Sequence, residues 1–231
     1  MVSVPRRIHI LGGEATGKTT LSRRLGSTLD APVHNLDAVA WIVGESDLEV
    51  LDPRFQPSAP VAPRPPEGRR QLVAEIAAGD AWVTEGKYVG WTAPLLERAD
   101  VIVFLDHVPT WRATIHILAR AARSAIREAR RRRGRDRFLR FRDYAVHGRE
   151  LAMQLYRRIG YGGRNRPAAD ALPADEGEAG DDPSRAAALA SLQPFAAKLV
   201  HVRRRSQLEE FMADVEARVA AGRTAGPDGR P

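Results

Sequence analysis

Gly12-Gly13-Glu14-Ala15-Thr16-Gly17-Lys18-Thr19 is the stretch that decides the fold of this 231-residue chain. An apolar run with strand character, residues 7–11, precedes it, and residues 18–25 follow with leucines at helical spacing. Glycines in such a loop let backbone N–H groups turn toward phosphates, and the helix N-terminus adds its positive end. Lys18 can then reach the outer phosphates, and the Thr19 hydroxyl can bind Mg²⁺. The motif therefore predicts a site for a nucleoside triphosphate, formed by Gly12, Gly13, Glu14, Ala15, Thr16, Gly17, Lys18, Thr19 and Thr20.

Segments with strand and helix character alternate along the chain, which is typical of an α/β fold with a mainly parallel sheet between two layers of helices. The expected strands cover residues 7–11, 31–36, 81–84, 101–105 and 198–202, and the expected helices cover 18–25, 69–78, 109–133, 137–159 and 207–221. Composition rich in proline, glycine or acidic residues predicts flexible loops at 44–68 and 160–184. We expect one domain over residues 1–222, followed by a disordered tail at 223–231.

Composition limits the chemistry of the protein. The chain has 43% hydrophobic residues, enough for a core, but no run of the roughly 20 apolar residues that a membrane helix needs, so we expect a soluble, cytoplasmic protein without a membrane partner. It has no cysteine, which excludes disulfides, thiolate metal sites and thiol catalysis. Any bound metal would need oxygen or imidazole ligands.

Three acidic residues follow expected strands: Asp37, Glu85 and Asp106. Ligands bind at the carboxyl ends of strands in open α/β sheets, and phosphoryl transfer needs a carboxylate near Mg²⁺ and another near the attacking hydroxyl. We expect Glu85 to serve Mg²⁺ together with Thr19, and Asp37 to orient the acceptor. Asp106 remains an alternative metal carboxylate. The structural alternative for each is a helix cap or a solvated loop residue.

The net charge of +7 is unevenly placed, because residues 112–166 carry 17 Arg and four acids, a local balance of +13. Within this segment Arg120, Arg123, Arg127 and Arg130 share one helix face, where guanidinium groups could reach triphosphate oxygens. We expect Arg120 and Arg123 to act in catalysis. A solvated surface is the competing interpretation for most of these arginines.

Four ring-bearing residues lie near the predicted ligand-binding edge of the sheet: His34, Trp41, Tyr88 and Trp91. Such rings could stack on a base or support a lid hinge, although packing is their commoner role.

Four sequence blocks resemble the P-loop kinases of the adenylate kinase-like group, and more closely the DNA topology modulation protein family. They are residues 8–21, 32–41, 82–88 and 98–106, which include the loop, a Leu-Asp-x-x-x-Trp block and Glu85-Gly86-Lys87-Tyr88. The resemblance implies a P-loop NTPase fold with strand order 2-3-1-4-5, ATP and Mg²⁺ as cofactors, and an Arg-rich helical lid over residues 112–166. Glu85 stands where the family has Asp.

The resemblance also implies transfer of a phosphoryl group to a small acceptor, most plausibly a nucleoside or nucleoside monophosphate. Two alternatives stay open: a nucleotide-dependent nucleic-acid-binding protein in which the basic segment grips a phosphate backbone and ATP hydrolysis is a switch, and a degenerate relative that binds ATP without an acceptor. A regulatory GTPase lacks support, because the chain has no Asn-Lys-x-Asp segment for reading guanine. The sequence does not name the acceptor or the oligomeric state.

Overall fold

A five-stranded parallel sheet lies at the centre of the computed structural model, which describes residues 4–42, 62–131 and 185–224. The strands are β1 (Arg7–Gly12), β2 (Val33–Asn35), β5 (Trp82–Gly86), β6 (Val101–Leu105) and β7 (Leu199–Val202). Their order across the sheet is β2-β5-β1-β6-β7. Counted along the chain within this sheet alone, that order is 2-3-1-4-5. The labels run higher because β3 and β4 form a separate two-stranded sheet.

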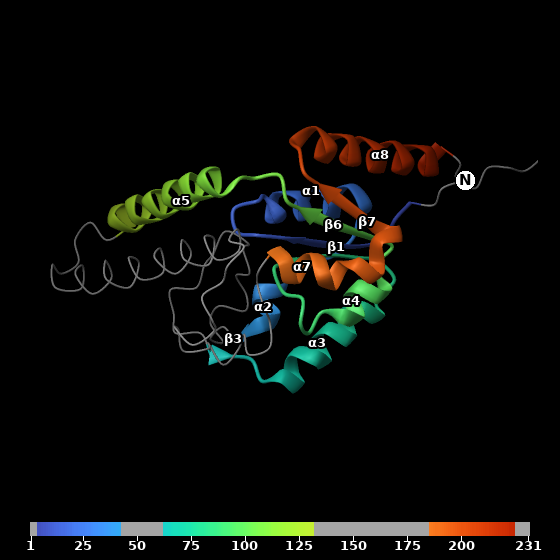
Figure 1. The fold of residues 1–231 in the computed structure, drawn as a ribbon, viewed down its shortest axis with the longest axis horizontal. Coiled ribbons are helices and arrows are strands. Elements are labelled where there is room, and N and C mark those ends of the chain that lie inside the picture. Colours follow the sequence, from blue (N-terminus) through green and yellow to red (C-terminus); the bar gives the residue numbers. More distant parts are fainter. Residues whose placement is uncertain (1–3, 43–61, 132–184, 225–231) are drawn as a thin grey trace, which may run out of the picture.

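Helices cover both faces of the sheet (Figure 1). One face carries α1 (Lys18–Leu29) and α8 (Arg205–Thr224), and the other carries α2 (Leu36–Ala40), α3 (Pro66–Ala78), α4 (Ala93–Arg98) and α7 (Arg185–Leu192). A 3-10 helix, η3 (Gln193–Lys198), joins α7 to β7. Helix α5 (Thr110–Arg131) follows β6 and extends away from the sheet (Figure 1). The three-layer α/β architecture expected from the sequence is confirmed.

Two apolar clusters hold these layers together, one on each face of the sheet. Alternate residues of β1 point to opposite faces, so Ile8 and Ile10 pack with α1 and α8, while Leu11 packs with the helices of the other face. Strand β6 is apolar throughout because both of its faces are covered. Its bounds match the expected strand 101–105.

The second strand is shorter than expected, and its end decides where Asp37 lies. The strand ends at Asn35, whose side-chain oxygen accepts a hydrogen bond from the backbone N–H of Asp37 at 2.8 Å. This N-cap starts α2 at Leu36, since Asn is a favoured cap residue. Asp37 therefore lies on a short helix rather than at the end of a strand. Glu85 lies inside β5, which runs to Gly86.

The described end of the expected loop at 44–68 contains regular secondary structure. Strand β3 (Trp41–Ile42) pairs antiparallel with β4 (Ala62–Pro63), and α3 begins at Pro66, because proline suits the first turn of a helix. The short helices α4 and α7 were also not predicted, since six to eight residues give too little periodicity. Residues 43–61, the predicted helix 137–159, the predicted loop 160–184 and most of the predicted tail lie outside the described residues.

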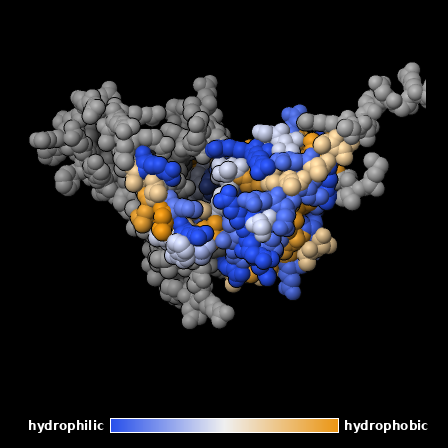
Figure 2. All heavy atoms as spheres, turned by 90° about the horizontal axis from the view of Figure 1, so that it is seen from above, coloured by the Kyte–Doolittle hydropathy of each residue, from blue (hydrophilic) through white to orange (hydrophobic). Residues whose placement is uncertain are grey.

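Helix α5 confirms the long helix expected after β6, and it carries an apolar stripe. Ala113 and Ile117 are buried, whereas Trp111, Ile115 and Leu118 are exposed. In Figure 2 hydrophobic colours accordingly reach the surface over this helix, next to otherwise hydrophilic atoms. Most of the Arg-rich segment lies beyond residue 131, outside the described residues, so the lid role is not established. No helix among the described residues is long and apolar enough to cross a membrane.

Candidate nucleotide-binding site

The loop between β1 and α1 follows the carboxyl end of a central strand of the sheet. Gly17, the N-cap of α1, has a φ of 90°, a conformation that strongly favours glycine. It provides no side-chain cap, and the first turn of α1 contains no acidic residue. The first N–H groups of the helix and its positive end are therefore available to an anion.

Gly12 is required by a close approach to the neighbouring strand. A Cβ atom there would lie 2.8 Å from the backbone oxygen of Leu105 and 3.1 Å from its Cβ. Both obstacles belong to a buried strand, so neither can move freely. The glycine lets the loop leave β1 directly beside β6.

Replacement of Gly12 by Ala is expected to lower the free energy of unfolding by roughly 1–3 kcal/mol, the usual range for overpacking. Denaturant unfolding followed by circular dichroism measures this change. Gly222→Ala is the matched control, because its Cβ would meet Val4 at an ordinary 3.7 Å and alanine favours the helix in which it lies. Equal stability of Gly12→Ala and the wild type would contradict the close approach.

Lys18 is folded back over the loop. Its Nζ donates to the backbone oxygen of Gly13 at 2.9 Å, and the Thr16 hydroxyl donates to the same oxygen at 2.8 Å. The lysine nitrogen is thus held within the turn of the loop. A phosphate bound there would provide stronger, charged acceptors than this carbonyl.

Thr19 and Glu85 meet directly, although 66 residues separate them in the chain. The Thr19 hydroxyl donates to Oε1 of Glu85 at 2.7 Å. Strand pairing explains the contact, because β5 lies beside β1 with Glu85 opposite Ile10, two residues before Gly12. A hydroxyl and a carboxylate oxygen at the start of α1 are the ligand types that Mg²⁺ prefers.

Burial disfavours the charged forms of both Lys18 and Glu85. It lowers the pKa of the Lys18 ammonium, although the carboxylates of Glu85 and Asp37 oppose this shift. Burial also raises the pKa of the Glu85 carboxyl group, against the attraction of Lys18 and the hydrogen bond from Thr19. In the protein alone, each charge is incompletely compensated. Phosphate oxygens beside Lys18 and a divalent cation beside Glu85 would complete the compensation of these two charges.

Among the described residues, no group of three or more His, Cys, Asp or Glu side chains could hold a metal ion by itself. A cation at Thr19 and Glu85 would therefore take further ligands from phosphates and water. Mg²⁺ is commonly bound in this way, by one or two protein groups plus substrate phosphates.

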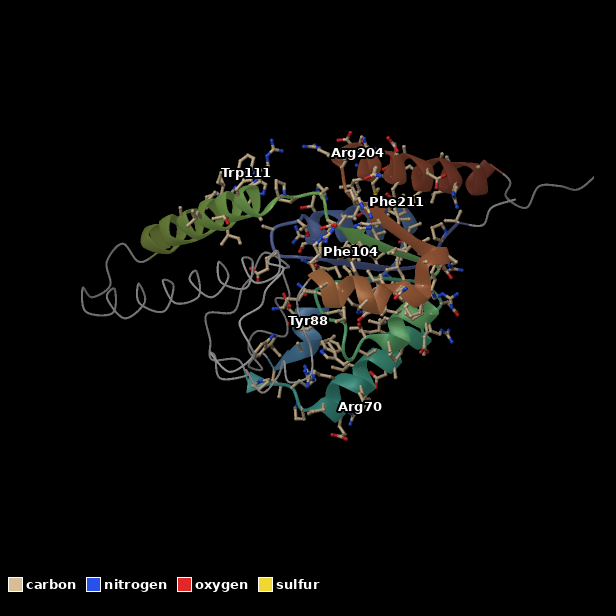
Figure 3. The ribbon with its side chains drawn as sticks, in the orientation of Figure 1. Arg70, Tyr88, Phe104, Trp111, Arg204 and Phe211 are labelled. Atoms are coloured by element: carbon tan, nitrogen blue, oxygen red, sulfur yellow. The ribbon has the colours of Figure 1, made fainter. Side chains whose placement is uncertain are left out.

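Asp37 lies close enough to Lys18 and Glu85 to affect their pKa values, and it contacts Tyr88. The Tyr88 hydroxyl donates to Oδ1 of Asp37 at 2.8 Å, and Trp41 Nε1 donates to the Tyr88 oxygen at 3.3 Å. Arg64 holds the end of the same short helix, donating from Nε to the backbone oxygen of Val39 at 3.0 Å. Figure 3 shows Tyr88 beside α2, on the segment that follows β5.

Asp106 is bound by two side chains that lie outside the loop. Arg185 binds its carboxylate at 2.6 to 3.0 Å, and His201 Nε2 lies 2.9 Å from Oδ2. Burial alone would raise the pKa of Asp106, but the hydrogen bonds from Arg185 and His201 outweigh it and lower the pKa. Its charge is already compensated, unlike that of Glu85.

The predicted catalytic arginines are not brought to the loop within the described residues. Arg123 is exposed and donates to the backbone oxygen of Ala119, one turn earlier in α5. The backbone of Arg120 lies in the same helix, while its side chain is outside what the structure describes.

Several residues near the site were not predicted from the sequence, or were predicted without a specific role. Lys87 is close enough to Lys18 to affect its pKa, and Arg23 acts similarly on Glu85. The position of Lys87, directly after the Glu-Gly pair, could have indicated it. Arg64 lies at the end of a proline-rich stretch, where no sequence signal marks it. Trp91 packs on Tyr88, with ring centroids 4.8 Å apart.

No family model matches the chain, and no curated protein does. Solved structures with a similar arrangement include a gluconokinase from Sinorhizobium meliloti 1021, with 13% identity, 95% of this chain and 94% of that chain covered, and a TM-score of 0.37. Shikimate kinase from Bacteroides thetaiotaomicron has 16% identity, with 92% and 97% covered and a TM-score of 0.35. Shikimate kinase from Acinetobacter baumannii, in complex with shikimate, has 18% identity, with 84% and 94% covered and a TM-score of 0.30.

Proposed function

We propose that this chain is a P-loop kinase of the adenylate kinase-like group that transfers the γ-phosphoryl group of ATP to a small acceptor. The observation that carries the proposal is the 2.7 Å contact between the Thr19 hydroxyl and the Glu85 carboxylate, beside the half-buried side chain of Lys18. Phosphoryl transfer requires this combination: a cationic group for the outer phosphates and oxygen ligands for the cation that accompanies them.

Each residue of the proposed site has its own role. Backbone N–H groups of residues 13–19 would cradle the phosphates, and Lys18 would exchange the Gly13 oxygen for phosphate oxygens. Thr19 and Glu85 would hold Mg²⁺, which when bound neutralises charge on the transferring group. Asp37, exposed on α2, would orient the acceptor. Arg120 and Arg123 would close over the transferring group, for which Arg123 would have to release its hydrogen bond to the Ala119 oxygen.

We propose a nucleoside or nucleoside monophosphate as the acceptor, on the basis of the sequence blocks that resemble the DNA topology modulation protein family. Among these blocks, Leu-Asp-x-x-x-Trp and Glu-Gly-Lys-Tyr meet at one place, since Tyr88 contacts both Asp37 and Trp41. Their convergence, with Asp37 near Lys18 and Glu85, supports an acceptor side beside the phosphate loop.

The test is ADP formation from ATP and Mg²⁺ by the full chain, screened against nucleosides, nucleoside monophosphates, polyhydroxylated acids and short DNA. Acceptor-dependent ADP formation with one small molecule is the expected result. Stimulation by DNA alone, with a steep loss of activity as salt is raised, would favour a nucleic-acid-binding protein instead. Binding of ATP with no turnover for any acceptor would overturn the kinase assignment.

A further inference from the structure

We propose that Tyr88 is a positioning residue for phosphoryl transfer, which holds the Asp37 carboxylate so that one of its oxygens faces the acceptor. The inference rests on the proposed function, since it concerns the acceptor side of the same site. It is carried by a chain of two hydrogen bonds, from Trp41 Nε1 to the Tyr88 oxygen at 3.3 Å and from the Tyr88 hydroxyl to Oδ1 of Asp37 at 2.8 Å.

The chemistry of the three side chains fixes the direction of both hydrogen bonds. An indole N–H can only donate, so the Tyr88 oxygen must act as the acceptor for Trp41. Tyr88 has a single hydroxyl proton, and it is directed to Asp37. Oδ1 of Asp37 is thereby engaged, while Oδ2 has no hydrogen-bond donor among the described residues. One oxygen is anchored and the other is available to a substrate hydroxyl.

Tyr88 is rigid enough for this role. Its side chain is 1% exposed, its ring packs on Trp91, and the Thr92 hydroxyl donates to its backbone oxygen at 3.0 Å. A buried phenol held on three sides loses little further freedom when the acceptor binds.

Asp37 is equally constrained from its own helix. Asn35 caps its backbone N–H, and Arg64 binds the backbone oxygen of Val39 at the other end of α2. Since the backbone on both sides of the Tyr88 to Asp37 contact is fixed, the contact determines which carboxylate oxygen is presented.

In the transfer step, the acceptor oxygen bonds to the γ-phosphorus as the bond from that phosphorus to the leaving ADP oxygen breaks. The proton of the acceptor hydroxyl passes to Oδ2 of Asp37. Tyr88 keeps its own proton throughout. Its contribution is orientation, because a carboxylate free to rotate would present Oδ2 to the acceptor only part of the time.

The test uses Tyr88→Phe, which removes the hydroxyl and keeps the ring. With the acceptor found in the screen, kcat is expected to fall about 10- to 100-fold while KM for ATP stays within twofold, because the phosphate loop is untouched. Trp41→Phe is expected to lower kcat less. The Tyr88→Phe/Trp41→Phe double variant should match Tyr88→Phe alone, since Trp41 acts through Tyr88.

Trp82→Phe is the matched control for loss of an indole ring. Trp82 is also buried, but its Nε1 has no hydrogen-bond partner among the described residues, so the change costs packing alone. It is expected to lower the thermal midpoint and leave kcat unchanged.

Each outcome distinguishes the two claims. An active wild type together with an unchanged kcat in Tyr88→Phe overturns the positioning role and leaves the kinase assignment intact. Additive losses in the double variant, or an equal loss of acceptor-independent ATP hydrolysis, also overturn it, since both indicate a general structural effect. A wild type that turns over no acceptor overturns the proposed function and this inference with it.

Discussion

Lys18→Ala is expected to lower kcat for acceptor-dependent ADP formation by roughly 10²- to 10³-fold, the usual loss when one charge-stabilising group is removed from a transfer site. The ammonium lies on the loop, where its Nζ donates to the Gly13 oxygen at 2.9 Å. Steady-state kinetics with saturating ATP and acceptor measure the effect, and calorimetry measures the accompanying loss of ATP affinity.

Lys198→Ala is the matched control. Lys198 lies at the opposite edge of the sheet, where its Nζ donates to the backbone oxygens of Glu97 and Ala99 at 2.7 and 3.0 Å. Its removal is expected to lower thermal stability and leave kcat unchanged. A fully active Lys18→Ala protein would contradict the assignment of the loop as the site of transfer.

Glu85→Gln is expected to have two opposite effects, a loss of turnover and a gain of stability. Turnover should fall about 10²-fold and require more Mg²⁺, because an amide is a poorer cation ligand than a carboxylate. Stability should rise because the buried carboxylate is the less favoured form of Glu85 in the folded protein, as its raised pKa indicates.

The pH dependence follows from the same shift. The folded-state pKa of Glu85 lies above its unfolded value, so the ionised group destabilises the fold at neutral pH, and this penalty disappears as the pH falls through the raised pKa. The stability difference between Glu85→Gln and the wild type should therefore be largest at neutral pH and should shrink toward zero at acidic pH. Thermal unfolding without nucleotide, measured from neutral to acidic pH, checks this.

Asp106→Asn is the control with the opposite sign. Arg185 and His201 lower the pKa of Asp106, so its stabilising effect is present above the unfolded pKa and is lost as the pH falls through the folded one. The variant should be less stable than the wild type at neutral pH and keep its Mg²⁺ requirement. If Asp106→Asn, rather than Glu85→Gln, raised the Mg²⁺ requirement, Asp106 and not Glu85 would be the carboxylate that serves the metal.

The loop between β1 and α1 was predictable because the residues that specify it are neighbours in the sequence. Glycines, a lysine and a threonine within eight residues, between a strand and a helix, specify the turn with little help from the rest of the chain. The strand at 101–105 was equally clear, since a strand covered on both faces has an uninterrupted apolar sequence. The second strand was misjudged because the Asn35 side-chain oxygen accepts a hydrogen bond from the Asp37 backbone N–H, which ends the strand and starts a helix.

The α/β fold, and a glycine-rich loop suited to phosphates, could be predicted from the amino-acid sequence alone. The tertiary structure was needed to show which carboxylate lies beside Thr19, because the sequence predicts all three acids at strand ends in similar settings. The pairing of β5 with β1 brings Glu85 to Thr19, while Arg185 and His201, distant in the chain, neutralise Asp106. The two hydrogen bonds that link Trp41, Tyr88 and Asp37 likewise join two separate sequence blocks. Such pairings depend on the register of the sheet and the packing of helices upon it, which no local pattern encodes.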